Sequence, residues 1–282
     1  MAGNTCLFNN KGNVMDKKII LNKYSKPEDK LLISKMLDKI ELSKLKNKIE
    51  NTDFLDMYNK HLLEKILKQE KIENYIISGG TEDTERDIIV FYPEKLKEVV
   101  NISYKKILPI TCIRINLPKE MYGKYSHRDY LGGLMKLGIK REKIGDIFVF
   151  EDGADILILD EISKFLLNNI SSLTRFSKSK IEKISIEDIR KKEINKEEFK
   201  LIVPSMRLDA VISELLRTSR GKAEEIIKEQ RVFVNFENVD KLTRQIKEKD
   251  LITVRGKGRF EIVEIEGTTR NDRIKLIANK YV

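Results

Sequence analysis

The apolar residues of the first patterned stretch recur at helical spacing. Within "PEDKLLISKMLDKIELSKLKN" an apolar stripe lies opposite a lysine-rich side, and a second such stretch, "NTDFLDMYNKHLLEKILKQ", follows it. The positions expected to be buried are Leu31, Leu32, Met36, Leu37 and Ile40, then Leu55, Leu62, Leu63, Ile66 and Leu67. The pattern predicts a helical amino-terminal region over residues 15–72. Residues 1–14 show no periodicity, and we expect a disordered tail or an extension left from cloning there.

The period of the apolar residues changes near residue 75. Two short apolar runs, Tyr75–Ile77 and Ile88–Tyr92, flank a turn-forming stretch and predict a β-hairpin. Strand and helix patterns then alternate through "ILPITCIRINLP", "HRDYLGGLMKLG", two strands joined at Asp152 and Gly153, "EISKFLLNNI" and a further strand at Ile181–Ile186. This alternation predicts an α/β sandwich, with helices on one face of a sheet, over residues 73–190. A charged linker is expected over 191–204.

The carboxy-terminal third predicts a small unit of two helices and a sheet over residues 205–267. "SMRLDAVISELLRT" is amphipathic, and Ser219 is placed to cap a second helix that packs on the first. "RVFVN" alternates as a strand, and "DLITVRGKGRFEIVEI" predicts a hairpin that turns at Gly256–Gly258. Residues 268–282 are expected to be a carboxy-terminal extension. The whole chain is therefore predicted to be of the α+β class.

Charge and composition narrow the class of partner. The 282 residues carry a net charge of +10, with a sequence pI of about 9.3, and such a balance favours nucleic acid or an anionic membrane surface. No apolar run approaches the roughly 20 residues that span a bilayer, and the amino end lacks the pattern of a signal peptide. Two cysteines and two histidines, far apart, provide neither a disulfide framework nor a zinc site. We expect a cytoplasmic protein with no metal and no cofactor.

The second helix of the carboxy-terminal unit begins with an unusual arrangement of charge. Arg220 and Lys222 lie in its first turn, where the helix dipole disfavours cations. Free backbone N–H groups also point outward at a helix start, so a docked phosphate would satisfy the N–H groups and both cations together. Arg207 and Arg231 can join the same patch. The competing interpretation is a set of ordinary solvated surface cations.

Several motifs of this unit resemble, in order, the S-four domain, an RNA-binding module named after a ribosomal small-subunit protein. They are the R-L-D start, S-R-x-x-A at the second helix, V-x-V-N in the strand and D-x-I-x-V-R-G in the hairpin. The resemblance implies RNA binding by Arg207, Ser219, Arg220, Lys222, Arg231 and Asn235, with Arg255, Lys257 and Arg259 on the hairpin. One position departs from the family, because Gln230 stands where glycine is usual. A helix end that prefers a left-handed residue must accept a side chain there, so we expect the local turn to differ.

The resemblance extends upstream to nearly the whole chain from Met15. "TDFLDMYNKHLLEKIL" and "YSHRDYLGGLMKLGIKREKIGDIFV" are similar to the YlmH family of bacterial S-four proteins. That family implies a helical amino-terminal region, a middle domain like an RNA-recognition motif (RRM), and the S-four domain. It also implies binding to ribosomal RNA or tRNA on the large ribosomal subunit carrying peptidyl-tRNA, in rescue and quality control of stalled translation. A link to cell division has also been proposed for the family.

A second group of cations lies in the middle domain. His127-Arg128-Asp129 is not a kinase catalytic loop, because Leu134 stands where that loop needs asparagine. The residues around it form a second candidate RNA patch, with plain structure as the alternative: His127, Arg128, Lys136, Lys140, Arg141 and Lys143. The aromatic sheet signature by which ordinary RRMs stack bases is missing.

The sequence predicts a protein that is not an enzyme. No nucleophile–base or metal constellation has supporting spacing. The first alternative is an RNA-modifying enzyme targeted by an S-four domain, since the R-L-D at Arg207–Asp209 also occurs in pseudouridine synthases. It would require a pocket with converging polar groups in the middle domain, and we predict none. The second alternative is a division-linked adaptor that binds partners through the lysine-rich helices.

Overall fold

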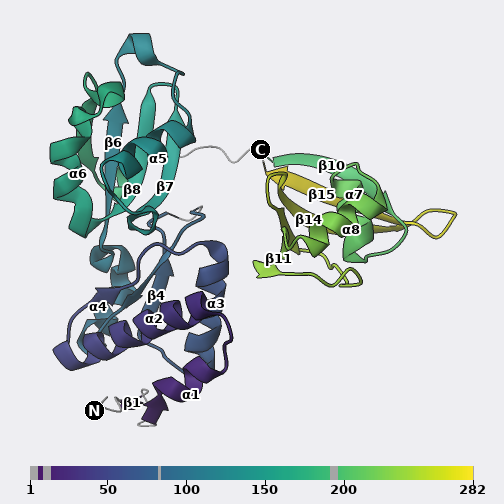
Figure 1. The fold of residues 1–282 in the computed structure, drawn as a ribbon, viewed down its shortest axis with the longest axis horizontal. Helices are drawn as coiled ribbons and strands as arrows, with labels where there is room; N and C mark the ends of the chain where they lie inside the picture. Colours follow the sequence, from purple (N-terminus) through teal and green to yellow (C-terminus); the bar gives the residue numbers. More distant parts are fainter. Residues whose placement is uncertain (1–5, 9–13, 82–83, 191–195, 282) are drawn as a thin grey trace. The chain divides into compact units, whose positions relative to one another are not determined.

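The computed structural model describes residues 6–8, 14–81, 84–190 and 196–281. The chain forms two units, Met1–Lys191 and Lys192–Val282 (Figure 1). Both mix helices with antiparallel sheets, which confirms the predicted α+β class. Within the segment 1–14, for which a disordered tail or a cloning extension was predicted, β1 (Cys6–Phe8) pairs with β2 (Val14–Asp16), so the predicted disorder does not apply to this strand. The rest of that tail lies outside the described residues.

Three helices form the outer layer of the first unit: α1 (Lys17–Asn22), α2 (Pro27–Lys46) and α3 (Met57–Gln69). Pro27 begins α2, where its missing N–H costs nothing, and the Asp56 side chain caps α3 by accepting from the Asn59 N–H at 2.8 Å. The predicted apolar stripe is buried at most of its positions. Leu31 is an exception, since 58% of it is exposed.

A three-stranded sheet lies against these helices. β3 (Glu50–Asn51), β4 (Tyr75–Ser78) and β5 (Ile88–Phe91) pair in the order β3-β5-β4. The predicted hairpin is confirmed, but the domain boundary at 72/73 needs correction, because β5 pairs with β3 of the preceding segment. Alternate residues of β5 enter different cores, so that Ile89 packs with the helices and Ile88 with the next sheet.

The next sheet has the RRM topology. β6 (Ile110–Asn116), β7 (Ile144–Phe150), β8 (Gly153–Leu159) and β9 (Lys180–Ile184) pair antiparallel in the order β7-β8-β6-β9. Two helices, α5 (His127–Lys136) and α6 (Ser163–Asn169), bury their apolar sides with one face of this sheet (Figure 1). The predicted sandwich and the hairpin at Asp152-Gly153 are confirmed. A short helix, α4 (Lys97–Ser103), connects the two sheets.

The second unit is a six-stranded sheet with two helices on one face (Figure 1). The helices are α7 (Leu208–Leu215) and α8 (Arg220–Lys228), as the sequence predicted. The strands, given in chain order, are β10 (Lys196–Val203), β11 (Val232–Val234), β12 (Glu237–Asn238), β13 (Leu251–Val254), β14 (Gly258–Thr268) and β15 (Ile274–Tyr281). Their spatial order is β10-β15-β14-β13-β11-β12.

Two predicted segments of this unit are corrected. Much of the expected linker over 191–204 is strand β10, and much of the expected extension over 268–282 is strand β15. They pair with each other along their whole lengths, from Lys196 with Tyr281 to Val203 with Ile274. The high charge of "KEEFKLIV" concealed an alternating strand whose Leu201 and Val203 are buried. The six-stranded sheet therefore needs both ends of this unit.

Gln230, which follows α8, keeps the left-handed backbone that glycine usually takes there, with φ 56°, so the expected difference in the local turn is not seen in this dihedral angle. We expect Gln230→Gly to raise the free energy of unfolding by about 0.5 kcal/mol, because relief of left-handed strain outweighs the extra entropy of glycine in the unfolded chain. Chemical denaturation of the full chain measures it. Lys228→Gly, in the last turn of α8, is the control and should have the opposite sign. A loss of stability in Gln230→Gly would contradict the strain argument.

Candidate nucleic-acid interface

A buried carboxylate bridges two of the arginines predicted to bind RNA. Asp209, in the first turn of α7, is 0% exposed. Its Oδ1 and Oδ2 atoms each accept from Arg207 at 3.0 Å, through Nε and Nη2. Its Oδ2 atom also accepts from Nε and Nη2 of Arg220, at 2.9 and 2.7 Å. We call Arg207, Asp209 and Arg220 the α7–α8 triad, and it fixes the planes of both guanidinium groups.

The α7–α8 triad keeps its charge and its outward donors. Burial by itself raises the pKa of Asp209, but the hydrogen bonds from Arg207 and Arg220 outweigh it and hold the pKa below its ordinary value. The carboxylate is thus ionised at neutral pH and cancels one of the two cations. Half of the Arg220 side chain remains exposed. The Nη1 groups of both arginines make no hydrogen bond to any described residue, so they remain available as donors.

The start of α8 offers backbone donors next to the triad. Ser219 caps the helix, and its Oγ accepts from the Lys222 N–H at 3.2 Å. The N–H groups of Arg220 and Gly221 have no partner among the described residues. The Lys222 ammonium lies 2.6 Å from Glu225, with both side chains exposed. An anion at this end would therefore meet N–H groups, the positive end of the helix dipole and Arg220.

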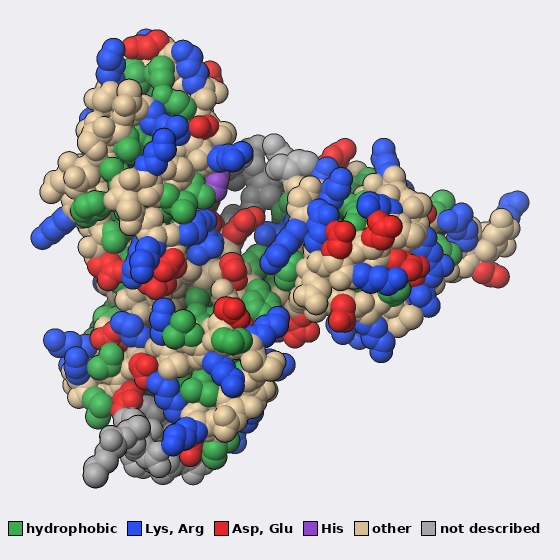
Figure 2. All heavy atoms as spheres, in the orientation of Figure 1, with side chains coloured by type: hydrophobic (Ala, Val, Ile, Leu, Met, Phe, Trp, Pro, Cys, Tyr) green, Lys and Arg blue, Asp and Glu red, His purple; other side chains and the backbone are tan. Residues whose placement is uncertain are grey.

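Other predicted residues of this unit make contacts within the protein. Arg231 donates to the Arg255 carbonyl at 2.9 Å and pairs with Glu229 at 3.2 Å. The Arg255 guanidinium lies over the ring of Phe233, 4.9 Å from its centroid. The Arg259 guanidinium lies 5.8 Å from the ring centroid of Tyr281, while Lys257 is exposed in the β13–β14 turn. Figure 2 shows blue and red side chains interspersed on the visible face of this unit, so the start of α8, and not a uniformly basic face, is the candidate RNA contact.

Asn235 has a structural role in the turn after β11. Its backbone is left-handed, with φ 49°. Its Nδ2 donates to Asp250 at 2.7 Å and its Oδ1 accepts from the Leu251 N–H at 2.9 Å. Asparagine tolerates this backbone and its amide can bond on both sides, which explains the residue without any RNA. Its assignment to RNA binding remains a prediction.

The second candidate patch is smaller than the sequence indicated. Arg141 donates to the carbonyl of Ile144 at 2.5 Å, and Lys143 lies 2.5 Å from both Asp53 and Glu161. Desolvation of the ring and then the nearby Arg141 charge lower the pKa of His127, so it is uncharged at neutral pH. The cations of this patch that are exposed and form no ion pair with another described residue are Arg128, Lys136 and Lys140. These lie on or just after α5.

The sheet face that ordinary RRMs use for RNA is covered here. That face lies opposite the helices and stacks bases on aromatic side chains of the two central strands. In this protein the central strands β6 and β8 place Cys112 and Leu157 there, both 0% exposed. They share a core with Ile88 and Val90 of β5. Burial also raises the pKa of the Cys112 thiol to about 12, so the thiol is inert.

A second arginine–aspartate–arginine arrangement, which the sequence did not predict, closes the same face. Asp155 on β8 is 0% exposed and accepts from Nε and Nη2 of Arg114, both at 2.8 Å. It also accepts from the backbone N–H of Arg190 at 3.0 Å and from its Nη2 at 2.9 Å. The Arg190 guanidinium stacks on Phe150, 4.1 Å from the ring centroid. We call Arg114, Asp155 and Arg190 the β6–β8 triad. It holds the end of the first unit against its sheet.

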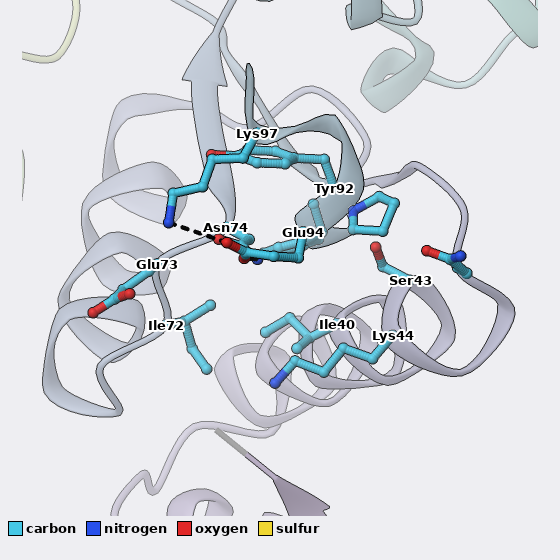
Figure 3. A pocket seen from close by; sticks show the side chains of 12 residues that line it. Ile40, Ser43, Lys44, Ile72, Glu73, Asn74, Tyr92, Glu94 and Lys97 are labelled. Atoms are coloured by element: carbon cyan, nitrogen blue, oxygen red, sulfur yellow. Dashed lines mark hydrogen bonds and ion pairs between the residues drawn. The ribbon is translucent and has the colours of Figure 1, made fainter. Parts of the chain in front are cut away.

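One pocket of about 590 Å³ lies in the amino-terminal layer, between α2 and the segments around Asn74 and Glu94 (Figure 3). Ile40 and Ile72 line its apolar side. The polar groups bond to one another, since Glu94 accepts from Asn74 at 2.6 Å and lies 3.2 Å from Lys97. The lining contains no paired nucleophile and base. Among the described residues no cluster of histidine, cysteine and carboxylate side chains could hold a metal ion.

The comparisons with known proteins agree with this architecture. Residues 107–188 match the family model described as "Putative RNA-binding domain in YlmH", and residues 206–252 match the model of the S4 domain. The chain carries a YlmH RNA-binding domain and an S4 domain. This confirms the resemblance predicted from the sequence motifs. The YlmH domain coincides with the RRM-like sheet, and the S4 match covers α7, α8 and the strands up to β13.

A curated relative matches this chain over most of its length. It is the "Ribosome-associated protein quality control protein P2" of Bacillus subtilis (strain 168), 28% identical over 230 residues, which are 79% of this chain and 83% of the relative. A solved structure, "Cell division protein ylmH from Streptococcus pneumoniae", is 20% identical and matches with a TM-score of 0.46, over 59% of this chain and 98% of that one. No described helix is long and apolar enough to cross a membrane.

Proposed function

We propose that this protein docks on structured RNA of the large ribosomal subunit, or on its bound tRNA, and acts in quality control of stalled translation. The observation that carries the proposal is the α7–α8 triad beside the open N–H groups of Arg220 and Gly221. The S4 match and the name of the Bacillus relative point in the same direction. The protein would work in the cytoplasm, without a cofactor and without catalysing a reaction.

The contact would be electrostatic and would recognise the shape of the RNA backbone, not its base sequence. Asp209 holds the two guanidinium planes, so each arginine presents its remaining N–H donors in a fixed direction. Phosphate oxygens match those donors and the α8 start, while the covered RRM face cannot stack bases. Such phosphate contacts release bound counterions, so affinity should fall steeply with salt.

The test is sedimentation of cell lysate through a density gradient at low and moderate salt. We expect wild-type protein in the large-subunit fractions and an Arg220→Ala/Lys222→Ala variant at the top of the gradient. The variant removes two cations from the α8 start, which should reduce affinity about ten-fold or more. Arg220→Lys keeps the charge but loses the fork that contacts Asp209, and should bind at an intermediate level.

The matched control is Lys241→Ala/Lys247→Ala, which removes two exposed cations elsewhere in the same unit. It should sediment like wild type. Thermal unfolding of each variant separates lost folding from lost binding. If wild type and the α8 variant both stay at the top of the gradient, the ribosome proposal is rejected. If both sediment with the large subunit, the ribosome proposal stands, but the RNA contact lies outside the start of α8.

A further inference from the structure

The β14–β15 hairpin continues well beyond the core of the second unit. The last buried side chains along it are Ile262 on β14 and Leu276 on β15, while the strands themselves run to Thr268 and from Ile274. From Ile265, which pairs with Leu276, to the tip at Arg270 the ribbon reaches roughly 15 Å at about 3.3 Å per residue. Figure 1 shows the loop of this hairpin, in yellow, projecting from the body of the second unit. The S4 match ends at residue 252, so it does not include this feature.

The tip of the hairpin is built as a fixed turn. The Thr269 N–H donates to the Arg273 carbonyl at 2.7 Å, and the Asp272 N–H donates to the Thr269 carbonyl at 3.1 Å. The Thr269 hydroxyl accepts from the N–H groups of Asn271 and Arg273, at 3.3 and 3.2 Å. Asp272 takes the left-handed backbone that closes such a loop, with φ 55°. The side chains of the tip are therefore presented on an ordered backbone.

The ribbon is also bent on its way out. Its pairing register shifts twice, between Ile262 and Glu264 and between Ile265 and Gly267, and Gly267 has φ 111°. Bulges of this kind increase the local twist and redirect the strand that carries them. An extension that only completed the core would need neither the bulges nor the projecting residues. The geometry indicates a segment directed at something outside the protein.

The side chains at the tip are basic and polar. Arg270, Arg273 and Lys275 are exposed, and among the described residues none of them forms an ion pair. The Arg273 side chain donates one long hydrogen bond, to the Ile202 carbonyl at 3.4 Å. The nearest acid along the strand, Glu266, is paired with Lys200 at 2.7 Å. Asp272 is the single acid within the loop, so cations outnumber it.

We propose that this tip is a second RNA contact of the carboxy-terminal unit and binds the phosphate backbone of structured RNA. The inference rests on the proposed function and extends it beyond the α8 start. From Glu266 to Arg273 the tip carries no apolar side chain, so it lacks the anchor that protein interfaces use. Its arginines, threonines and asparagine are the donors that contact phosphate and sugar. A rigid turn lowers the entropy lost on binding.

The test measures binding to purified large-subunit ribosomal RNA over a range of salt concentrations, by fluorescence anisotropy of the labelled full chain. We expect Arg270→Ala/Arg273→Ala to lower the affinity about ten-fold at roughly 0.1 M salt. The slope of log affinity against log salt should fall by about 1.5, as expected for two lost phosphate contacts. Thr269→Ala keeps every charge but loosens the turn, and should lower the affinity less, with the slope unchanged.

Three controls make the outcomes distinct. Arg270→Ala alone spares the bond from Arg273 to Ile202, so its effect cannot come from that contact. Lys241→Ala/Lys247→Ala removes the same charge from elsewhere in the unit. If the hairpin variant binds like wild type while Arg220→Ala/Lys222→Ala loses binding, the hairpin proposal is overturned and the α8 contact stands. If wild-type protein itself does not bind this RNA, the hairpin proposal is rejected, while the sedimentation test still decides the proposed function.

Discussion

Asp155→Asn is expected to lower the free energy of unfolding of the first unit by about 3 kcal/mol, because it leaves two arginines against a buried amide that cannot neutralise them. Arg114 and Arg190 are 21% and 26% exposed, so water can compensate only in part. The carboxylate lies at 0% exposure and accepts from three side-chain donors at 2.8–2.9 Å. Chemical denaturation, followed by a probe in the first unit, measures the loss.

The control for this prediction is Glu151→Gln, an exposed acid at the β7–β8 turn that forms no ion pair among the described residues. It removes the same charge and should change stability by no more than about 0.5 kcal/mol. A loss in Asp155→Asn no larger than that of the control would show that the β6–β8 triad contributes nothing. The second unit should keep its own transition, because Asp155 belongs to the first unit.

Asp209→Asn is expected to have two effects that net charge alone cannot produce together. The stability of the second unit should fall by about 2 kcal/mol, since Arg207 and Arg220 lose their buried partner. RNA affinity should fall about five-fold although the variant is one unit more positive, because the guanidinium planes are no longer fixed. A gain of affinity would show that charge matters and orientation does not.

Glu225→Gln is the matched control for the binding effect. It also makes the second unit more positive by one charge, and it releases Lys222, which lies 2.6 Å from Glu225. We expect its RNA affinity to rise, opposite to Asp209→Asn. Anisotropy with the same ribosomal RNA compares the two variants, and thermal unfolding verifies that both are folded at the assay temperature.

The pH dependence of the Asp209 effect has a definite sign. Its arginine partners hold the pKa of the folded carboxyl below the ordinary value despite burial. The stabilising contribution is therefore fully present above the unfolded pKa, about 4, and is lost as pH falls through the folded pKa. The stability difference between wild type and Asp209→Asn should be constant from neutral pH to about pH 5 and shrink below that. A difference that grows on acidification would contradict the assignment.

The interface was only partly readable from the sequence. The motif spacing placed Arg207 and Arg220 together, and the structure joins them through Asp209. The sequence did not distinguish exposed cations from cations that bond within the protein. Arg141 and Lys143 resemble Lys140 in the sequence, but Arg141 donates to a carbonyl and Lys143 pairs with two carboxylates. Asp53, a partner of Lys143, lies far from it along the chain. The carbonyl that Arg141 contacts is near in the chain, but it is brought into reach by a turn whose geometry the residue types do not specify.

The sequence by itself determined the local elements of this protein. Helical periodicity and capping residues located α2, α3, α7 and α8, and alternation with turn residues located the β4–β5, β7–β8 and β13–β14 hairpins. These signals are local, since they depend on which side each neighbouring residue faces. The left-handed backbone at Gln230 was not determined by such local signals, because the expectation there came from the glycine that is usual in the S-four resemblance.

Only the tertiary structure decided how those elements pair. An apolar run such as β5 is buried on both faces, and nothing within it states that one side meets α2 and α3 while the other covers β6 and β8. The charged strand β10 and the terminal strand β15 are recognised only next to each other. Burial of Asp155 and Asp209 likewise depends on arginines brought from other elements. Pairing and burial of this kind arise from contacts between distant parts of the chain, which local periodicity does not encode.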